Sequence, residues 1–329
     1  MTAQFAPELA VVLSFHGVVR RVDDTAIQVN HVDLEAFARI VERVRAQYEV
    51  VTLDDVAAAV RGEAPLPERA AALTFDDAYR SVLEVADPLL SEHGLPYAVF
   101  VPSRLVDAGS RVPTFVMRAA LSLTEEPSVR LPGRRRAFKL RTPDDRERAA
   151  AHAAELLRSL PLPEADRVVT HLRELVPADA WAAVYSRFPS EELLGWPELR
   201  SLAARGVAVG SHTRDHAVLH EGQDDDEVVA QLESSKAAIE ERLSIECRHL
   251  AFPHGHPRDV SRAAVEAARR AGYRTGFLNV GGPVREGMDP LFLPRIPIAG
   301  SPAEAAMADR VQLSHSKWYR EAAKELGLV

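Results

Sequence analysis

The chain has few of the features that mark secreted scaffolds or membrane proteins. Cys247 is its single cysteine among 329 residues, so no disulfide can form within one copy, although this says nothing about the compartment. No apolar run approaches the roughly 18 residues that span a membrane. Residues 1–8 contain no basic segment, and the apolar run at residues 9–15 is short. These absences predict a cytoplasmic protein without a membrane span.

An excess of basic charge is also missing. The chain has 48 acidic against 40 basic side chains and a formal net charge of -8. A nucleic-acid partner requires a basic surface, so we expect none here. Hydrophobic residues make up 47% of the chain, enough for a large core. The length suggests about two domains, but α/β barrels of roughly 250 residues form one domain, so a barrel with an insertion also fits.

Strand-like and helix-like segments alternate along most of the chain, which is typical of repeated βα units and a parallel sheet. Strands are expected at residues 10–15, 49–53, 70–75, 97–101, 206–211, 248–252, 275–279 and 293–298. Helices are expected at residues 33–47, 54–61, 79–92, 196–205, 224–243 and 259–271. The pattern predicts an α/β fold, a modified (β/α) barrel of about seven parallel strands.

The alternation stops near residue 103 and resumes near residue 196. The intervening stretch is rich in proline and has helical patterns at residues 144–160 and 165–175. We therefore expect a barrel formed by residues 1–103 and 196–329, with a mainly helical insertion at 104–195. The insertion leaves the barrel at the end of a strand, and loops on that rim often determine specificity.

A basic segment lies inside this insertion. It contains six cations with no acid between them, namely Arg130, Arg134, Arg135, Arg136, Lys139 and Arg141. Such a patch could hold a phosphate or a carboxylate, for which the arginine fork is suited. The alternation of apolar and basic residues on both sides of Pro132 and Gly133 favours a simpler interpretation, a hairpin whose charges decorate a solvated face.

Two adjacent acids, Asp76 and Asp77, follow the strand expected at residues 70–75. Neighbouring carboxylates raise each other's pKa unless something separates their roles, and a divalent cation bound to one of them does so. The alternative is that Asp77 caps the following helix while Asp76 is simply solvated. Both acids can reach one cleft only if the strand ends there and the chain turns.

A histidine pair, His212 and His216, follows another expected strand. The two side chains converge on one ion if the backbone after Ser211 makes a helical turn, which places positions i and i+4 on one face. One carboxylate with two histidines is a metal site with room for water and substrate, and a second carboxylate supplies a base. The combination predicts metal-assisted hydrolysis.

These residues resemble the polysaccharide deacetylases, the NodB-homology domain of carbohydrate esterase family 4. The family's first motif, Thr-Phe-Asp-Asp, matches the residues from Thr74 to Asp77. The second, His-Ser/Thr-x-x-His, matches from His212 to His216 without a substitution. The third ends in Pro-Tyr-Gly, and the segment around His254 is similar, with histidine in place of tyrosine.

The resemblance implies a role for each matched residue. Asp77, His212 and His216 would bind Zn²⁺ or another divalent metal ion, and Asp76 would be the general base. The backbone N–H of His254 would be the oxyanion donor. A bound ion would polarise the acyl carbonyl. The implied function is removal of an acyl group, most simply acetyl, from an N-acyl sugar or polysaccharide.

Two departures from the family pattern concern the base and the acid. Ala251 stands where many members have an arginine that steadies the base, and the late Leu-x-His motif has no good match, since His315 falls in an expected terminal helix. His16 resembles the strand-tip histidine of the circularly rearranged branch and is the candidate general acid; the alternative is a structural histidine. Arg295 resembles an arginine of that branch and could orient the base, or could be a surface residue.

Two other functions stay open. The same fold and metal site could hydrolyse another C–N bond, as in a cyclic amide, imide or formamide, because the motifs define a water-activating centre rather than a sugar pocket. A non-catalytic carbohydrate-binding relative would keep the motifs without the chemistry, and the presence of Asp76 argues against it. The expected partner is a carbohydrate or other N-acyl substrate, and nothing marks an oligomeric state.

Overall fold

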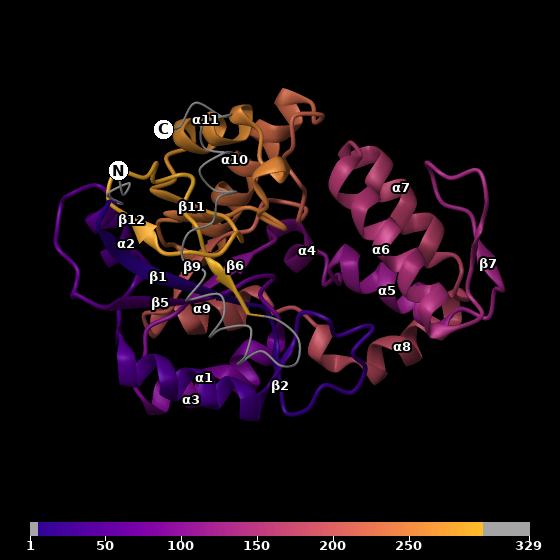
Figure 1. The fold of residues 1–329 in the computed structure, drawn as a ribbon, viewed down its shortest axis with the longest axis horizontal. Coiled ribbons are helices and arrows are strands. Elements are labelled where there is room, and N and C mark those ends of the chain that lie inside the picture. The colour runs from indigo at the N-terminus through magenta and orange to yellow at the C-terminus, as the bar shows by residue number, and fades with distance from the viewer. Residues whose placement is uncertain (1–5, 299–329) are drawn as a thin grey trace, which may run out of the picture.

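A computed structural model describes residues 6–298 of the chain. Residues 1–5 and 299–329 lie outside the described part, and with them His315 and the terminal helix expected around it. Figure 1 shows a central, curled sheet flanked by helices, with a separate group of helices beside it.

The sheet has nine strands, and most of them are parallel. The main path runs in the order β11-β10-β9-β6-β5-β1-β12, with β4 paired to β5 and β13 paired to β1. Only β12 is antiparallel to its neighbour β1. The strands are β1 (Glu8–Phe15), β4 (Glu49–Val50), β5 (Ala70–Phe75), β6 (Ala98–Val101), β9 (Ala208–Ser211), β10 (His249–Ala251), β11 (Thr275–Phe277), β12 (Val284–Arg285) and β13 (Ile296–Pro297). The expected barrel-like α/β fold is confirmed.

Four of the helices around the sheet begin where the sequence supplies a capping side chain. Asp33, Thr52, Asp224 and Ser261 each accept hydrogen bonds from backbone N–H groups of the first turn, as good N-caps do. The helices are α1 (Leu34–Gln47), α2 (Leu53–Val60), α3 (Asp87–Glu92), α9 (Trp196–Ala204), α10 (Asp225–Leu243) and α11 (Arg262–Arg270), with a 3₁₀ turn at Pro257–Asp259.

The helix expected at residues 79–92 is not regular. A π-helical segment, Val82–Ala86, comes before α3. Asp77 and Ala78 have left-handed φ angles of 69° and 57°, which an α-helix does not accommodate. The chain therefore makes a turn before the helix begins. This turn is the one that carries the two adjacent acids.

Both faces of the sheet are buried, which explains why its strands are apolar almost throughout. In β5, Ala71 and Leu73 pack in one hydrophobic cluster, while Ala70 and Ala72 pack in another. Two backbone hydrogen bonds extend the ladder beyond the strands: Asp76 N donates to the Phe15 carbonyl, and His212 N donates to the Val101 carbonyl. The residues that follow β5 and β9 are therefore held rigidly at the strand ends.

The segment between β6 and α9 forms the group of helices at the right of Figure 1. Its elements are α4 (Ser103–Asp107), α5 (Pro113–Leu123), β7 (Ser128–Val129), β8 (Phe138–Lys139), α6 (Pro143–Ser159), α7 (Leu162–Arg173), α8 (Trp181–Arg187) and 3₁₀ turns at Ala178–Ala180 and Pro189–Glu191. Strands β7 and β8 pair antiparallel, and a second small sheet joins β2 (Val18–Val19) to β3 (Val32–Asp33). No helix in the described part of the chain is long and apolar enough to cross a membrane.

Candidate metal centre

Three side chains from two strand ends surround one point in space. Asp77 Oδ1 lies 3.2 Å from His216 Nε2 and 3.6 Å from His212 Nε2. One ligand atom from each residue lies within 4.8 Å of the other two. With bonds of about 2.0–2.2 Å from zinc to nitrogen and oxygen, ligand atoms at these separations can share a single ion.

The two histidines converge by a route that differs from the expected helical turn. Thr213 and His216 have left-handed φ angles of 62° and 57°, so the segment after β9 is a tight, non-helical turn. The Thr213 hydroxyl accepts a hydrogen bond from Ala217 N, and the Ser211 hydroxyl accepts one from Thr213 N. These side-chain contacts replace the helical ladder, and the imidazole rings end 5.0 Å apart.

The chemistry of the donors fits a divalent cation. Asp77 Oδ1 is buried and has no hydrogen-bond partner among the described residues. His212 Nδ1 lies 2.8 Å from the Ala251 carbonyl, to which it must donate, so its Nε2 presents a lone pair towards Asp77. Burial lowers the pKa of His212 to about 4, which favours the neutral form that binds metal. A cation would satisfy the buried oxygen and both nitrogens together.

The remaining pKa shifts in the trio follow from mutual attraction. Burial acts to raise the pKa of Asp77, but His216 and the other nearby histidines outweigh it and hold the pKa far below its usual range. Burial acts to lower the pKa of His216, and Asp77 outweighs it, so the net shift is upward. The trio thus keeps a full negative charge on Asp77.

Asp76, the other acid, points at a different partner. Its two carboxylate oxygens each accept a 2.7 Å hydrogen bond from the Arg295 guanidinium, and both side chains are buried. Arg295 also donates to Thr74 Oγ1 and to the Leu278 carbonyl. Although burial raises the pKa of Asp76, the charge of Arg295 outweighs it and the pKa falls to about 2. The interpretation of Arg295 as a surface residue is wrong, because its side chain is fully buried.

His16 and His254 lie beside these groups. His16 follows β1, its Nδ1 is buried without a hydrogen-bond partner in the described residues, and its charge helps to lower the pKa values of both aspartates. The ring of His254 lies 5.6 Å from that of His216. His254 has a left-handed φ of 59°, and its backbone N–H donates to no acceptor in the described part of the chain.

A buried pair next to this centre was not expected from the sequence. His31 Nε2 lies 3.3 Å from Glu191 Oε1, and the side chains are 1% and 2% exposed. Burial raises the pKa of Glu191 to about 8 and lowers that of His31 to about 4, so both groups are neutral at pH values between these. The His31 ring packs on the Gly17 backbone, where a Cβ atom would lie 2.5 Å from Nε2.

The residues around Glu191 also hold the turn that carries Asp77. Leu194 N donates to the Ala78 carbonyl at 2.8 Å, and Arg80 N donates to the Glu192 carbonyl at 2.7 Å. Tyr79 is buried there, and its pKa is raised by burial and by the nearby Asp77. Because these partners are more than 100 residues apart, no local pattern could have revealed them.

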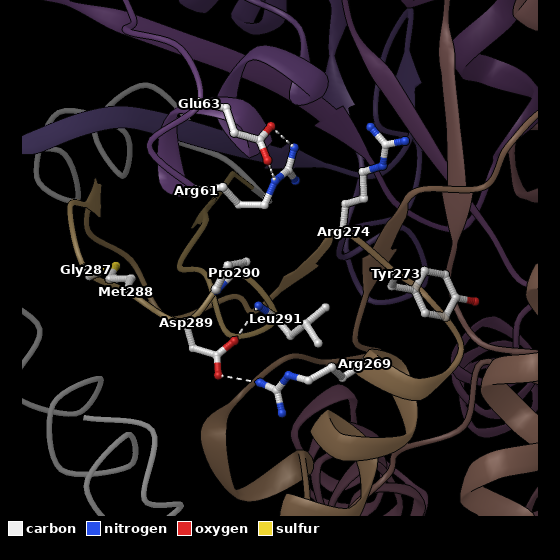
Figure 2. A pocket seen from close by; sticks show the side chains of 10 residues that line it. All are labelled: Arg61, Glu63, Arg269, Tyr273, Arg274, Gly287, Met288, Asp289, Pro290 and Leu291. Carbon is white, nitrogen blue, oxygen red and sulfur yellow. Dashed lines mark hydrogen bonds and ion pairs between the residues drawn. The ribbon is translucent and has the colours of Figure 1, made fainter.

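Two pockets differ in their relation to the centre. One lies between the metal-site turn and the helices α5, α6 and α7, and its lining includes His216, His254, Leu157, Leu160 and Leu162. Figure 2 shows the other, a more open pocket of about 600 Å³ lined by Arg61, Glu63, Arg269, Tyr273, Arg274, Gly287, Met288, Asp289, Pro290 and Leu291. It contains no residue of the metal centre, and the carboxylates of Glu63 and Asp289 already neutralise two of its arginines.

The fold and the site together define an α/β half-barrel with a candidate mononuclear metal centre at its strand ends. The family model described as polysaccharide deacetylase matches residues 162–276, a range that includes His212, His216 and His254. This match confirms the resemblance to the polysaccharide deacetylases that the motifs indicate. Asp76 and Asp77 lie outside the matched range.

Solved structures share the fold over nearly the whole chain. The deacetylase PplD of Streptococcus pyogenes, in complex with acetate, has a TM-score of 0.61 at 15% identity, covering 93% of this chain and 99% of its own. IcaB from Ammonifex degensii has a TM-score of 0.59 at 17% identity, covering 92% and 98%. A de-N-acetylase from Aggregatibacter actinomycetemcomitans has a TM-score of 0.56 at 15% identity, covering 92% and 99%. No curated protein matches this chain.

Proposed function

We propose that this chain is a metal-dependent hydrolase that removes an acyl group, most simply acetyl, from an N-acyl sugar or polysaccharide. The family match supports deacetylation of a carbohydrate. One observation carries the proposal: a three-residue cluster suited to a metal lies next to a separate carboxylate that is held ionised by a buried arginine.

Asp77, His212 and His216 would hold the ion, and their mixed nitrogen and oxygen donors make zinc the first candidate. Three protein ligands leave a coordination position open, as catalytic zinc sites require. When bound, such an ion supplies Lewis acidity towards the acyl carbonyl and lowers the pKa of water. Cytoplasmic location, expected from the sequence, stays a prediction.

The other residues would act on protons and on developing charge. Asp76, ionised beside Arg295, accepts a proton from the attacking water, while Arg295 fixes the orientation of that carboxylate. His16 donates a proton to the departing amine. The free backbone N–H of His254 stabilises negative charge on the carbonyl oxygen. The products are a carboxylic acid and an amino sugar.

We further propose the division of the chain into a deacetylase barrel, residues 1–103 and 196–329, and an insertion, residues 104–195, that borders the catalytic rim. The pocket beside His216 supports this arrangement, because its apolar wall comes from α6 and α7. Substrates would then reach the metal centre past the insertion, which would determine their specificity.

The proposal is tested with N-acetylglucosamine oligomers, by measuring acetate release and free amine. Chelation should abolish turnover and Zn²⁺ should restore it. His212→Ala should lose both metal and activity, whereas Asp76→Asn should keep its metal and lose about 10²- to 10⁴-fold in kcat. His93→Ala, which alters a histidine outside the centre, is the matched control and should be unaffected.

Four results would contradict the proposal. Full activity in chelator would exclude the metal, and full activity in Asp76→Asn would exclude the base. Hydrolysis of cyclic imides without acetate release from oligomers would favour the other C–N reaction. Failure to turn over any of these substrates when loaded with metal would favour a carbohydrate-binding protein.

A further inference from the structure

The hairpin formed by β7 and β8, residues 128–141, carries the densest positive charge of the insertion. We call it the basic hairpin. Its cations are all exposed, and within residues 6–298 none of them forms an ion pair with a carboxylate: Arg130, Arg134, Arg135, Arg136, Lys139 and Arg141. By contrast, exposed Arg148 nearby pairs with Asp145, and the chain as a whole carries a net charge of -8.

The basic hairpin is fixed to the insertion through its other face. Val129, Leu131, Phe138 and Leu140 are buried and alternate with the basic residues. The Pro132 carbonyl lies 2.9 Å from His152 Nε2 on α6, in hydrogen-bonding distance. The apolar face therefore holds the hairpin in place and leaves its cations on the solvent side. A hairpin with solvated charges, expected from the sequence, can thus also be a patch that binds phosphate or carboxylate.

The turn of the basic hairpin borders a pocket that shares one lining residue with the pocket at the metal centre. Pro132 lines a pocket of about 410 Å³ together with Leu160, Glu164, Arg167, Val168 and His171. Leu160 also lines the pocket that includes His216 and His254. Leu160 thus lines both pockets, and Pro132 places the turn of the basic hairpin at the second of them.

We propose that the basic hairpin binds negatively charged groups of the polymer whose N-acyl groups reach the metal centre. The substrate is then a polysaccharide that carries carboxylate or phosphate groups, an inference that rests on the proposed function. Arginine forks bind both groups through paired hydrogen bonds. Several weak surface contacts with one polymer add up, although each alone contributes little.

A polymer fits this surface better than a membrane does. Residues 132–137 of the turn are proline, glycine, three arginines and alanine, and none is a large apolar side chain of the kind that anchors proteins in a lipid interface.

The test compares two oligosaccharides of equal length with the metal-loaded full chain. One is a hyaluronan oligomer, in which N-acetylglucosamine alternates with glucuronate, and the other is a neutral chitin oligomer. Binding is measured by calorimetry at low salt, and turnover is recorded separately. The variant is Arg135→Gln with Arg136→Gln. The control is Arg43→Gln with Arg270→Gln, which removes the same charge from exposed arginines elsewhere.

We expect tighter binding of the hyaluronan oligomer, about fivefold weakened in the hairpin variant and unchanged in the control. Binding of the chitin oligomer should be the same in all three proteins, and 0.5 M salt should remove the difference. Equal affinity for both oligomers, equal weakening in both double variants, or a preference for anionic vesicles or for RNA would overturn the inference. Because affinity is measured without turnover, absence of acetate release would count against the proposed function alone.

Discussion

Two buried carboxylates near the metal centre have opposite pKa shifts. Asp76, at the end of β5, has a pKa lowered to about 2, whereas Glu191, where the insertion rejoins the barrel, has a pKa raised to about 8. Both side chains are almost fully buried. Asp76 faces the Arg295 guanidinium through two short hydrogen bonds, and Glu191 faces the His31 imidazole at 3.3 Å.

The comparison shows that the partner, more than the depth of burial, decides the charge. Burial penalises an ionised group, and only strong attraction to an opposite charge outweighs it. A guanidinium cannot lose its proton in a protein, so its carboxylate partner stays ionised. An imidazole can become neutral, and then a buried pair avoids both charges. Asp76 is therefore available as a base, while Glu191 serves as a neutral contact between the insertion and the barrel.

The largest expected effect comes from leaving Asp76 buried without its cation. Arg295→Met should lower the free energy of unfolding by about 3–5 kcal/mol, because an uncompensated charge stays in the core. The pKa of Asp76 should rise, and deacetylation should fall with it. Urea unfolding measures the loss of stability. The double variant Asp76→Leu with Arg295→Met removes both charges and should regain most of the stability while staying inactive; if the double variant is no more stable than the single one, the pairing argument fails.

A pH-dependent effect is expected from Glu191→Gln in metal-free protein. The folded pKa of about 8 lies above the ordinary 4.5, so the contribution of Glu191 to stability is complete below pH 4.5 and is lost as the pH rises through 8. Between these two pH values, the free energy of unfolding can fall by about 1.4 kcal/mol per pH unit. Glutamine mimics the neutral acid and should escape this loss. Urea unfolding at pH 5 to 8 measures the difference.

The control for Glu191 is Glu266→Gln, which alters a half-exposed acid on α11. Its stability relative to the unmodified chain should not depend on pH over this range. If Glu191→Gln likewise shows a constant difference, then Glu191 is ionised in the folded state and the contrast with Asp76 disappears.

The smallest effect is expected at the surface, where solvent screens the charges. Arg262 and Glu266 form an i,i+4 pair at 2.9 Å with side chains 70% and 45% exposed. Arg262→Gln should cost about 0.3–0.5 kcal/mol at low salt and nothing measurable at 1 M salt. Thermal unfolding at both salt concentrations checks this. If Arg262→Gln lost as much stability as Arg295→Met, then exposed and buried ion pairs would not differ in their contribution to stability.

Local patterns were sufficient to predict much of the fold. Strand β5 occupies the expected residues, and α1 and α10 begin within one residue of their expected starts, because apolar periodicity and capping side chains act over a few residues. The same patterns could not show that Asp77 and Ala78 interrupt the next helix, nor that a tight turn brings His212 and His216 together. Those features depend on left-handed backbone angles held by surrounding contacts.

The residue types of the candidate site could be predicted from the amino-acid order alone, as adjacent acids after one strand and paired histidines after another. Their partners were not. Arg295 meets Asp76 across 219 positions, and Glu191 meets His31 across 160, only because the curled sheet and the docked insertion carry them there. Local chemistry depends on neighbours in the chain, whereas ionisation in the core depends on neighbours in space.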